Sequence, residues 1–361
     1  MKKDFENRII KLRKILEEKN VDAILIYKNR DVLYTTGFYD KENNSVAIIS
    51  KDKLIFMTDG RFVNQFHEQV EGFDLILFEN IFNKFEKVNE ILKENNINKY
   101  LVNFEAISYK DALSLDANIE NVVDSSELIT NFRRTKTEEE IKLTKKACDI
   151  AEQSLLYTLD QIKEGMTELE IQNILNSEMS RRGSSRVAFP TIVVSGPDNG
   201  ASPHGVPTER KVQQGDFITI DFGATYQNYT SDITRTIAIG KVSDEMMEIY
   251  NQVLKAKTEC VSMLKPGEST NKIHKHADSV LKEIGYDLVH GLGHGIGLEN
   301  HELPKLTIST DYQLQVNDIH TIEPGIYAPG ICGVRIEDDY LITEDGYECL
   351  TPNITNELIT L

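Results

Sequence analysis

Four carboxylates and one histidine in the C-terminal part of the chain have the residue types of a site for divalent metal ions. Each of them lies inside a strand-like segment, where burying an unpaired charge would be costly. The five residues are Asp221, Asp232, His294, Glu323 and Glu337. Four carboxylates with one imidazole suit Mn, Co, Fe or Zn, and two such ions would neutralise the carboxylate charge. Because a pair of divalent ions can polarise both a water molecule and a carbonyl group, the set predicts hydrolytic chemistry.

The first two carboxylates are expected on neighbouring antiparallel strands. Residues 216–223 alternate between apolar and polar side chains, as do residues 232–239, so both segments are predicted to be strands. A tight turn near residues 226–227 would pair them and place Asp221 directly opposite Asp232, with Cβ atoms about 5 Å apart. Two carboxylates at that distance repel each other, so they must share either a proton or a cation.

The other two carboxylates repeat this arrangement. Counting outward from a turn that contains Pro and Gly brings Glu323 roughly opposite Glu337. Between the two hairpins, residues 290–297 read His-Gly-Leu-Gly-His-Gly-Ile-Gly. In a strand, this alternation places His290 and His294 on one face and leaves bare backbone on the other, so another segment is expected to pack closely behind them.

A competing interpretation is a network of buried carboxylates and arginines without metal. Arg235 and Arg335 would then act as counter-ions. Arg335 lies two residues before Glu337, hence on the same strand face, where it is expected to orient a ligand from behind even when metals are bound. A dinucleotide-binding loop is excluded, because position 296 is Ile where the GxGxxG pattern requires Gly.

The segments around these residues resemble the pita-bread metallopeptidases, and within them aminopeptidase P and prolidase, which cleave Xaa-Pro bonds. The resemblance is carried by Asp-Phe-Gly-Ala at residues 221–224, Ser-Asp-Ile-Thr-Arg-Thr at 231–236, Gly-His-Gly-Ile-Gly-Leu-Glu-Asn-His-Glu at 293–302, Thr-Ile-Glu-Pro-Gly-Ile-Tyr at 321–327 and Gly-Val-Arg-Ile-Glu-Asp at 333–338. It covers about the C-terminal two-thirds of the chain. The N-terminal third resembles, more weakly, the accessory domain that these enzymes share with creatinase, through residues 29–38 and 58–62.

The resemblance implies two domains of different fold classes. An N-terminal creatinase-like α/β domain is expected over residues 1–128, followed by a C-terminal pita-bread α+β domain over residues 129–361. A chain of 361 residues is also long for a single core. The resemblance further implies a homodimer with two divalent metal ions per subunit, manganese being expected first and cobalt, zinc or iron as alternatives.

The resemblance also gives roles to residues around the metals. Histidines at the positions of His204, His290 and His301 surround the metals in the family without being primary ligands. His301 would donate a hydrogen bond to the oxyanion, His204 would shuttle a proton or hold the substrate carbonyl, and His290 would bind the group beyond the proline. Glu323 is expected to be both a ligand and the general base. Lys305 stands where prolidase-like members often carry Arg, so it is expected to pair with the carboxylate of a dipeptide.

Three alternatives to an Xaa-Pro peptidase stay open. Non-catalytic peptide-binding proteins of this fold, and creatinase-like hydrolases that work without metal, lose metal ligands, whereas all five are present here. Methionine aminopeptidase shares the five-ligand scheme but normally lacks the N-terminal accessory domain. The ligands and the N-terminal third together favour an enzyme that acts on proline-containing peptides or Xaa-Pro dipeptides.

Composition restricts the partners and the location. A net charge of −18 and a pI near 5.0 argue against nucleic acid and anionic membranes as partners, because each would require a basic face. Four cysteines are scattered without a CxxC pair, which predicts reduced thiols rather than a zinc knuckle or a disulfide framework. The charged N-terminal segment is unlike a signal peptide, and no apolar stretch has membrane-spanning length. A cytoplasmic protein is therefore expected.

Local patterns predict the elements that position these residues. A helix over residues 4–19 is followed by strand-like segments at residues 21–27, 46–49, 54–57, 75–78 and 100–102. A polar connection without a strong pattern, residues 124–136, precedes a capping box of Thr137 and Glu140, which opens a helix expected to end near residue 162. A second capping box, Thr167 and Glu170, opens a helix expected to end at residues 181–183.

Overall fold

Residues 2–115 and 120–361 are described by the structure, which is a computed structural model. The chain divides into two compact units, Met1–Phe132 and Arg133–Leu361. None of the helices in the described ranges is long and apolar enough to cross a membrane. Each unit has its own sheets and its own apolar core.

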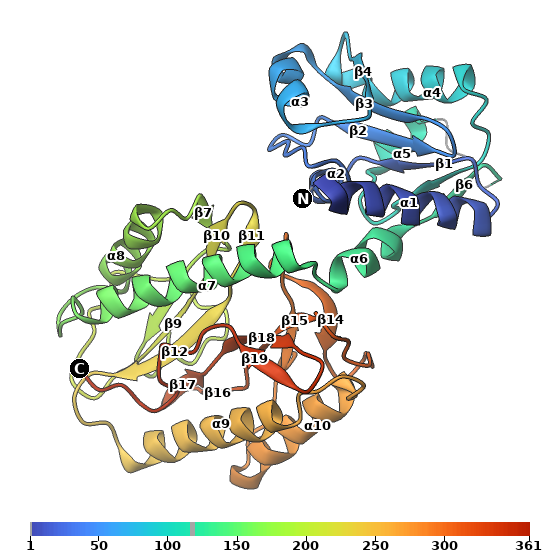
Figure 1. Ribbon diagram of the computed structural model, residues 1–361. Helices are drawn as coiled ribbons and strands as arrows, with labels where there is room; N and C mark the ends of the chain where they lie inside the picture. The colour runs from blue at the N-terminus through green and yellow to red at the C-terminus, as the bar shows by residue number, and fades with distance from the viewer. Residues whose placement is uncertain (1, 116–119) are drawn as a thin grey trace. The chain divides into compact units, whose positions relative to one another are not determined.

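The N-terminal unit is an α/β domain built on a six-stranded sheet with the order β4-β3-β2-β1-β5-β6. Its strands are β1 (Ala23–Ile26), β2 (Val46–Ser50), β3 (Leu54–Thr58), β4 (Asp74–Leu77), β5 (Tyr100–Val102) and β6 (Val122–Asp124), and its helices are α1 (Lys2–Glu18), α2 (Asn29–Thr36), α3 (Val63–Gln69), α4 (Lys84–Glu94) and α5 (Tyr109–Ser114). Helices α1 and α4 lie on opposite sides of this sheet (Figure 1). Alternate residues of β1, such as Ala23 and Leu25, share one core with Phe85 and Val88 of α4. The unit is the α/β domain that the sequence predicts.

The segment that joins the two units is more regular than predicted. Residues 124–136, whose sequence has no strong pattern, contain helix α6 (Ser126–Arg134). Its last turn holds Arg133 and Arg134, and both side chains are buried. Arg134 donates to both carboxylate oxygens of Asp318, at 2.9 and 2.7 Å. The sequence does not indicate this helix, because its arginines resemble a solvated connection, whereas they are buried and paired in the structure.

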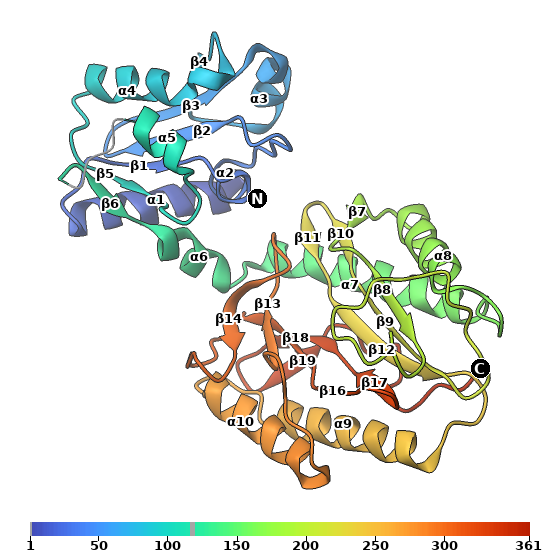
Figure 2. The ribbon, with the colours of Figure 1, turned by 180° about the vertical axis from the view of Figure 1, so that it is seen from behind.

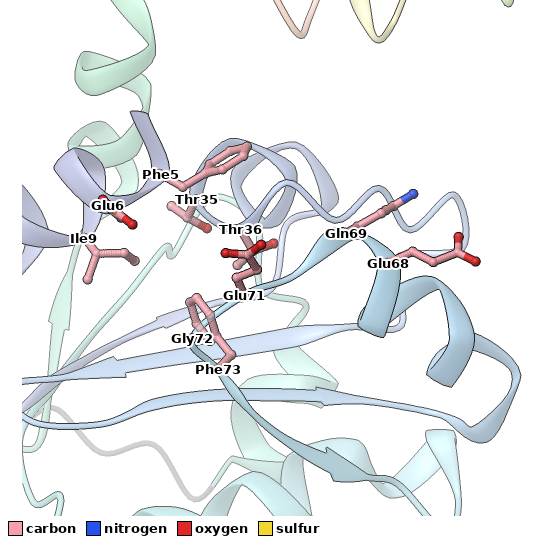
Figure 3. A pocket seen from close by; sticks show the side chains of 10 residues that line it. All are labelled: Phe5, Glu6, Ile9, Thr35, Thr36, Glu68, Gln69, Glu71, Gly72 and Phe73. Carbon is pink, nitrogen blue, oxygen red and sulfur yellow. The ribbon is translucent and has the colours of Figure 1, made fainter. Parts of the chain in front are cut away.

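A pocket of about 380 Å³ opens in the N-terminal unit beside α1 and α2. Apolar and acidic side chains line it in equal number (Figure 3). The apolar ones are Phe5, Ile9 and Phe73, and the acidic ones are Glu6, Glu68 and Glu71. All predicted metal ligands belong to the C-terminal unit, so this pocket contains none of them.

The C-terminal unit places small sheets between two pairs of helices. Its helices are α7 (Glu138–Leu159), α8 (Glu168–Arg181), α9 (Asp244–Ser262) and α10 (Thr270–Leu281). Its strands are β7 (Arg186–Val187), β8 (Ile192–Ser195), β9 (Phe217–Phe222), β10 (Ala224–Tyr226), β11 (Tyr229–Thr230), β12 (Ile233–Ala238), β13 (Gly293–Gly295), β14 (Glu302–Leu306), β15 (Ile319–Ile322), β16 (Gly325–Ala328), β17 (Cys332–Arg335), β18 (Asp338–Ile342) and β19 (Tyr347–Cys349). Helices α7 and α8 lie on one side of the strands, and α9 and α10 lie on the other (Figures 1 and 2).

Both predicted capping boxes begin helices of this unit. The hydroxyl of Thr137 accepts from the backbone N–H of Glu140, whose carboxylate accepts from the backbone of Thr137, and α7 follows. The pair Thr167 and Glu170 does the same for α8. Apolar residues of both helices share one core with β9 and β12, the strands that contain or adjoin Asp221 and Asp232.

Candidate metal centre

The first predicted pair of carboxylates lies on the predicted strands but in a different register. Strand β9 carries Asp221 and pairs antiparallel with β12, in which Thr234 lies directly opposite Asp221. Asp232 lies just before β12, two residues from Thr234, and therefore toward the same face of the hairpin. The prediction that Asp221 and Asp232 are directly opposed is wrong, because the two carboxylates are diagonal neighbours.

The shift comes from the position of the turn. It is predicted at residues 226–227, but β10 and β11 pair Tyr226 with Tyr229, so the two central residues are Gln227 and Asn228. Both central residues have positive φ, 44° and 73°, as in a type I′ hairpin turn. Moving the turn by one residue shifts the register by two, which preserves the face on which each side chain lies.

The second pair of carboxylates lies at an interruption of strand pairing. Strands β15 and β18 pair on one side of it, and β16 and β17 pair on the other. Ile322 lies opposite Asp338, and continuing this register by one residue places Glu323 opposite Glu337, in agreement with the outward count from the turn. The backbone N–H of Glu337 donates to Thr234 O of β12 at 3.0 Å. This hydrogen bond joins the two hairpins that carry the carboxylates.

The segment with alternating glycines forms a shorter strand than predicted, because β13 is limited to Gly293–Gly295. A Cβ atom at Gly293 would lie 2.1 Å from Thr321 O, and one at Gly295 would lie 2.1 Å from Leu303 O. Glycine is therefore required at both positions for the backbones of β15 and β14 to lie this close. The glycines permit a close approach, as predicted, but the segments that approach are the neighbouring strands of the same sheet and not one behind the histidines.

Three of the predicted ligands converge on one point. One ligand atom from each of Asp232, His294 and Glu337 lies within 4.8 Å of the other two. His294 Nε2 is 3.6 Å from Asp232 Oδ2 and 3.4 Å from Glu323 Oε1. Carboxylates from both hairpins therefore meet at the imidazole of β13.

The imidazole of His294 presents a lone pair to these carboxylates. Its Nδ1 lies 3.1 Å from Gly295 O, and donating to that carbonyl leaves Nε2 as the unprotonated nitrogen. Burial, followed by the nearby His301, lowers the pKa of His294 to about 3, so the ring is neutral at physiological pH. A lone pair that faces carboxylate oxygens is repelled by them unless a proton or a cation lies between.

The carboxylates are themselves buried and repel one another. Burial, followed by the charge of Glu337, raises the pKa of Asp232 well above its usual value. Burial also raises the pKa of Glu323 to about 8, with the charge of Asp221 adding to the effect and Arg335 opposing it. Asp221 Oδ1 and Glu337 Oε1 are buried oxygens without a hydrogen-bond partner in the described part of the chain. Divalent cations would give these oxygens a partner and relieve the repulsion, so the residues present fit a metal centre.

Two arginines were considered as counter-ions, and they lie in different places. Arg335 pairs with the carboxylate of Asp221 and donates to Tyr327 OH at 2.6 Å. Arg235 pairs instead with Asp338, at 2.7 Å. Arg235 also donates to the backbone oxygen of Glu337, at 2.5 Å. Arg335 is therefore paired with the carboxylate of a predicted ligand, whereas Arg235 contacts a ligand residue only through its backbone.

The three remaining predicted histidines surround this cluster. The rings of His301 and His294 are in an edge-to-face arrangement with centroids 4.1 Å apart. His290 Nε2 is 2.9 Å from Tyr327 OH, and burial lowers the pKa of His290 to about 4. His204 is exposed in the loop that follows β8. Burial, followed by the charge of His204, also lowers the pKa of His301, so these histidines are close enough to affect one another.

Polar side chains that the sequence analysis did not identify also contact the predicted ligands. Thr234 donates its hydroxyl to Glu337 Oε2 at 2.6 Å, and Asn300 donates to Asp232 Oδ2 at 3.2 Å. Tyr327 links His290 to Arg335. Strand alternation could have identified Thr234, which lies two residues after a predicted ligand, but the position of Asn300 in a loop gave no periodic signal.

A buried ion cluster lies behind the loop that carries His301. Glu302 accepts from Arg133 and, at 3.1 Å, from Lys136 Nζ, and all three side chains are at most 2% exposed. The backbone N–H of Glu299 also donates to Glu302, at 3.0 Å. Burial alone would raise the pKa of Glu302, but the charges of Arg133 and Lys136 outweigh it and hold the pKa at about 2. The carboxylate is thus charged at neutral pH and connects this loop to the first residues of the C-terminal unit.

We expect Glu302→Gln to lower the free energy of unfolding by about 3–5 kcal/mol near neutral pH, because the buried Lys136 and Arg133 lose the carboxylate that they share. Arg133 keeps its second ion pair, with Glu299 at 2.8 Å. The folded pKa of about 2 lies below the unfolded value of about 4.3, so the contribution is complete above the unfolded pKa and is lost as pH falls toward the folded pKa. Urea unfolding across this pH range measures the difference between wild type and variant. The matched control is Glu348→Gln, which breaks an exposed pair with Lys145 and should cost at most about 1 kcal/mol. Equal losses in the two variants, independent of pH, would contradict this account.

Comparison with known proteins gives consistent matches over both units. The profile of metallopeptidase family M24 matches residues 142–344, and that of the creatinase/prolidase N-terminal domain matches residues 8–135. The Xaa-Pro dipeptidase of Pyrococcus furiosus is 33% identical over 356 residues, which cover 96% of this chain and 98% of the relative. The solved structure of an Xaa-Pro dipeptidase from Bacillus anthracis is similar with a TM-score of 0.93 at 37% identity, covering 99% of this chain and 100% of that one. An X-Pro aminopeptidase from Thermotoga maritima gives a TM-score of 0.85 at 33% identity, covering 95% of this chain and 98% of that one.

Proposed function

The chain belongs to metallopeptidase family M24, and we propose that it is an Xaa-Pro peptidase that binds two divalent metal ions. The predicted fold class is confirmed, with a creatinase-like α/β domain followed by a pita-bread domain. Its relatives include both an Xaa-Pro dipeptidase and an X-Pro aminopeptidase. We therefore propose cleavage of the Xaa-Pro bond, and an experiment must distinguish dipeptide from longer peptide substrates.

One observation carries the proposal. The neutral Nε2 of His294 faces carboxylate oxygens of Asp232 and Glu323, at 3.6 and 3.4 Å, and this arrangement favours a bound cation. We infer that the metals are held by Asp221, Asp232, His294, Glu323 and Glu337, with manganese as the first candidate and cobalt, zinc or iron as alternatives. When bound, divalent ions supply an activated water and polarise the scissile carbonyl.

The protein's own residues would then move protons and orient the substrate. Glu323 accepts the proton of the attacking water through its carboxylate. His301 is next to His294 and donates an N–H to the oxygen that becomes negative. His204 delivers a proton to the leaving proline nitrogen, and His290 contacts the group beyond the proline. Arg335 orients the ligand carboxylate of Asp221.

Hydrolysis of Ala-Pro and of Ala-Pro-Ala by manganese-loaded protein tests the proposal. Cleavage of the dipeptide alone would identify an Xaa-Pro dipeptidase whose site recognises the C-terminal carboxylate. Efficient cleavage of the tripeptide would identify an aminopeptidase P. If elemental analysis shows bound metal and neither peptide is cleaved, the proposed function is wrong and a non-catalytic peptide-binding role replaces it.

Lys305 is the proposed partner of the dipeptide carboxylate. It is exposed on β14 and lies directly opposite His294 of β13, which places its ammonium group toward the metal side of the sheet. We expect Lys305→Ala to raise KM for Ala-Pro about tenfold or more, because a charge-assisted hydrogen bond is lost, while kcat changes less. Lys305→Arg should retain most of the affinity.

The matched control for Lys305 is Lys275→Ala, which removes an exposed lysine from α10 and should leave KM unchanged. Ala-Pro amide, which has no terminal carboxylate, should bind wild type and Lys305→Ala equally. An unchanged KM for Ala-Pro in Lys305→Ala would rule out this role.

A further inference from the structure

The loop that carries His204 is held from the side of helix α8. It runs from Ser195, the last residue of β8, to Thr208. The His204 side chain is exposed, so packing around the ring does not fix its place. Its position therefore depends on how the backbone of the loop is held.

Glu168, the first residue of α8, is fully buried and accepts five hydrogen bonds from this loop. Its Oε1 accepts from the backbone N–H and from the hydroxyl of Ser195, both at 2.7 Å. Its Oε2 accepts from Asn199 Nδ2 at 2.8 Å, and from the backbone N–H and hydroxyl of Thr208 at 2.9 and 2.7 Å. These donors come from the beginning, the middle and the end of the loop, so one carboxylate holds these three parts of the loop together.

This carboxylate is not needed to begin the helix. The capping box of Thr167 and Glu170 already satisfies the first turn of α8. A buried carboxylate is costly unless its oxygens accept hydrogen bonds, and those that Glu168 accepts come from the loop. The geometry therefore indicates that Glu168 shapes the loop rather than the helix end.

The opposite side of the loop contacts β17. Arg335 donates to Pro203 O, next to His204, at 3.2 Å. A Cβ atom at Gly333 would lie 1.9 Å from a backbone oxygen of the loop, so the strand packs directly against it. Because Arg335 also pairs with Asp221, the loop has a defined place relative to a proposed metal ligand.

We propose that Glu168 is a positioning residue that holds His204 in place beside the metal centre. The proposal rests on the proposed function, in which His204 moves a proton to the leaving group. Without the carboxylate, five donors lose their acceptor and the loop gains conformations in which His204 is displaced. A displacement of about 1 Å is enough to reduce a catalysed rate about a hundredfold.

Glu168→Gln tests this role, because it keeps the size of the side chain but replaces one acceptor oxygen with an NH₂ group that faces donors. For Ala-Pro we expect kcat to fall about tenfold to a hundredfold with little change in KM. In a His204→Ala background, the same substitution should cause no further loss, because the residue that it positions is absent. The matched control is Glu152→Gln, which alters another buried carboxylate, hydrogen-bonded to Asn353, and should leave kcat unchanged.

A second readout does not depend on activity, because the chain contains no tryptophan. Val206→Trp introduces a sole fluorophore at a position that is 72% exposed and two residues from His204. Adding Glu168→Gln should lower the anisotropy of this tryptophan and increase its quenching by acrylamide, whereas Glu152→Gln should change neither. If Glu168→Gln does not fold, Thr208→Val can replace it, because this substitution removes one of the five donors. It should lower the anisotropy and increase the quenching by smaller amounts.

Equal slowing by Glu168→Gln with and without His204 would overturn the proposal, and so would an unchanged mobility of the tryptophan. Failure of the proposed function has a different signature. In that case the metal-loaded wild-type protein cleaves no Xaa-Pro substrate, and the tryptophan readout alone decides whether Glu168 anchors the loop.

Discussion

Replacing Asp232 with Asn is expected to reduce hydrolysis of Ala-Pro by about a thousandfold or more and to remove bound metal. The ligand atom of Asp232 converges with those of His294 and Glu337 within 4.8 Å. An amide oxygen carries no charge and binds a divalent cation more weakly than a carboxylate. Loss of the metals removes several kcal/mol of transition-state stabilisation, and each 1.4 kcal/mol is about tenfold in rate. Elemental analysis and the Ala-Pro assay on one preparation measure both effects.

The stability of the metal-free protein distinguishes this result from misfolding. Without metal, Asp232 is a buried carboxylate among other carboxylates, which is why burial and the charge of Glu337 raise its pKa. Asn has nearly the same shape without the charge, so metal-free Asp232→Asn should unfold at the same or a higher temperature than metal-free wild type. Added metal should reverse the order, because wild type gains more from binding. Asp149→Asn, at an exposed position, should change neither property, and full metal content with full activity in Asp232→Asn would disprove the ligand role.

The positions of the predicted ligands in the structure show what local patterns can predict. Alternation of apolar and polar residues placed Asp221 and Asp232 on neighbouring strands, and that part of the prediction is correct. The register was wrong because the turn residues, Gln227 and Asn228, adopt positive φ without the Asn-Gly or Asp-Gly pair that marks such turns. The error did not change the predicted face of either carboxylate, because a shift of the register by two residues keeps every side chain on its face.

Long-range pairing accounts for most of what the sequence did not predict. Arg133 and Glu302 are 169 positions apart, and no local period relates them. The same holds for Glu168 and Thr208, whose contact depends on how α8 packs against the strand before the loop. Helix α6 was missed for a related reason, since the buried partners of its arginines lie far along the chain. Whether a charged residue is buried can therefore be inferred only when its partner in the fold is known.

The second large effect is expected at Arg335, where one buried guanidinium joins several parts of the centre. It pairs with Asp221, and it donates to Tyr327 OH at 2.6 Å and to Thr234 Oγ1 at 3.2 Å. Arg335→Met would leave the carboxylate of Asp221 buried without this cation, which should cost about 3–5 kcal/mol of stability in the metal-free protein. It would also free a proposed ligand to rotate, and loss of such an orienting contact typically reduces metal affinity or activity about tenfold to a hundredfold.

The expected result for Arg335→Met is therefore a kcat/KM for Ala-Pro reduced about a hundredfold, with weaker metal binding measured by titration. Arg335→Lys keeps the positive charge but not the planar fork that reaches several acceptors, so it should recover stability more fully than activity. Arg235→Met provides the matched comparison, because Arg235 is equally buried but pairs with Asp338 and contacts Glu337 only through its backbone oxygen. It should lose a similar free energy of unfolding and retain more of its kcat/KM. If Arg235→Met and Arg335→Met lose activity in proportion to stability alone, then Arg335 does not orient a ligand.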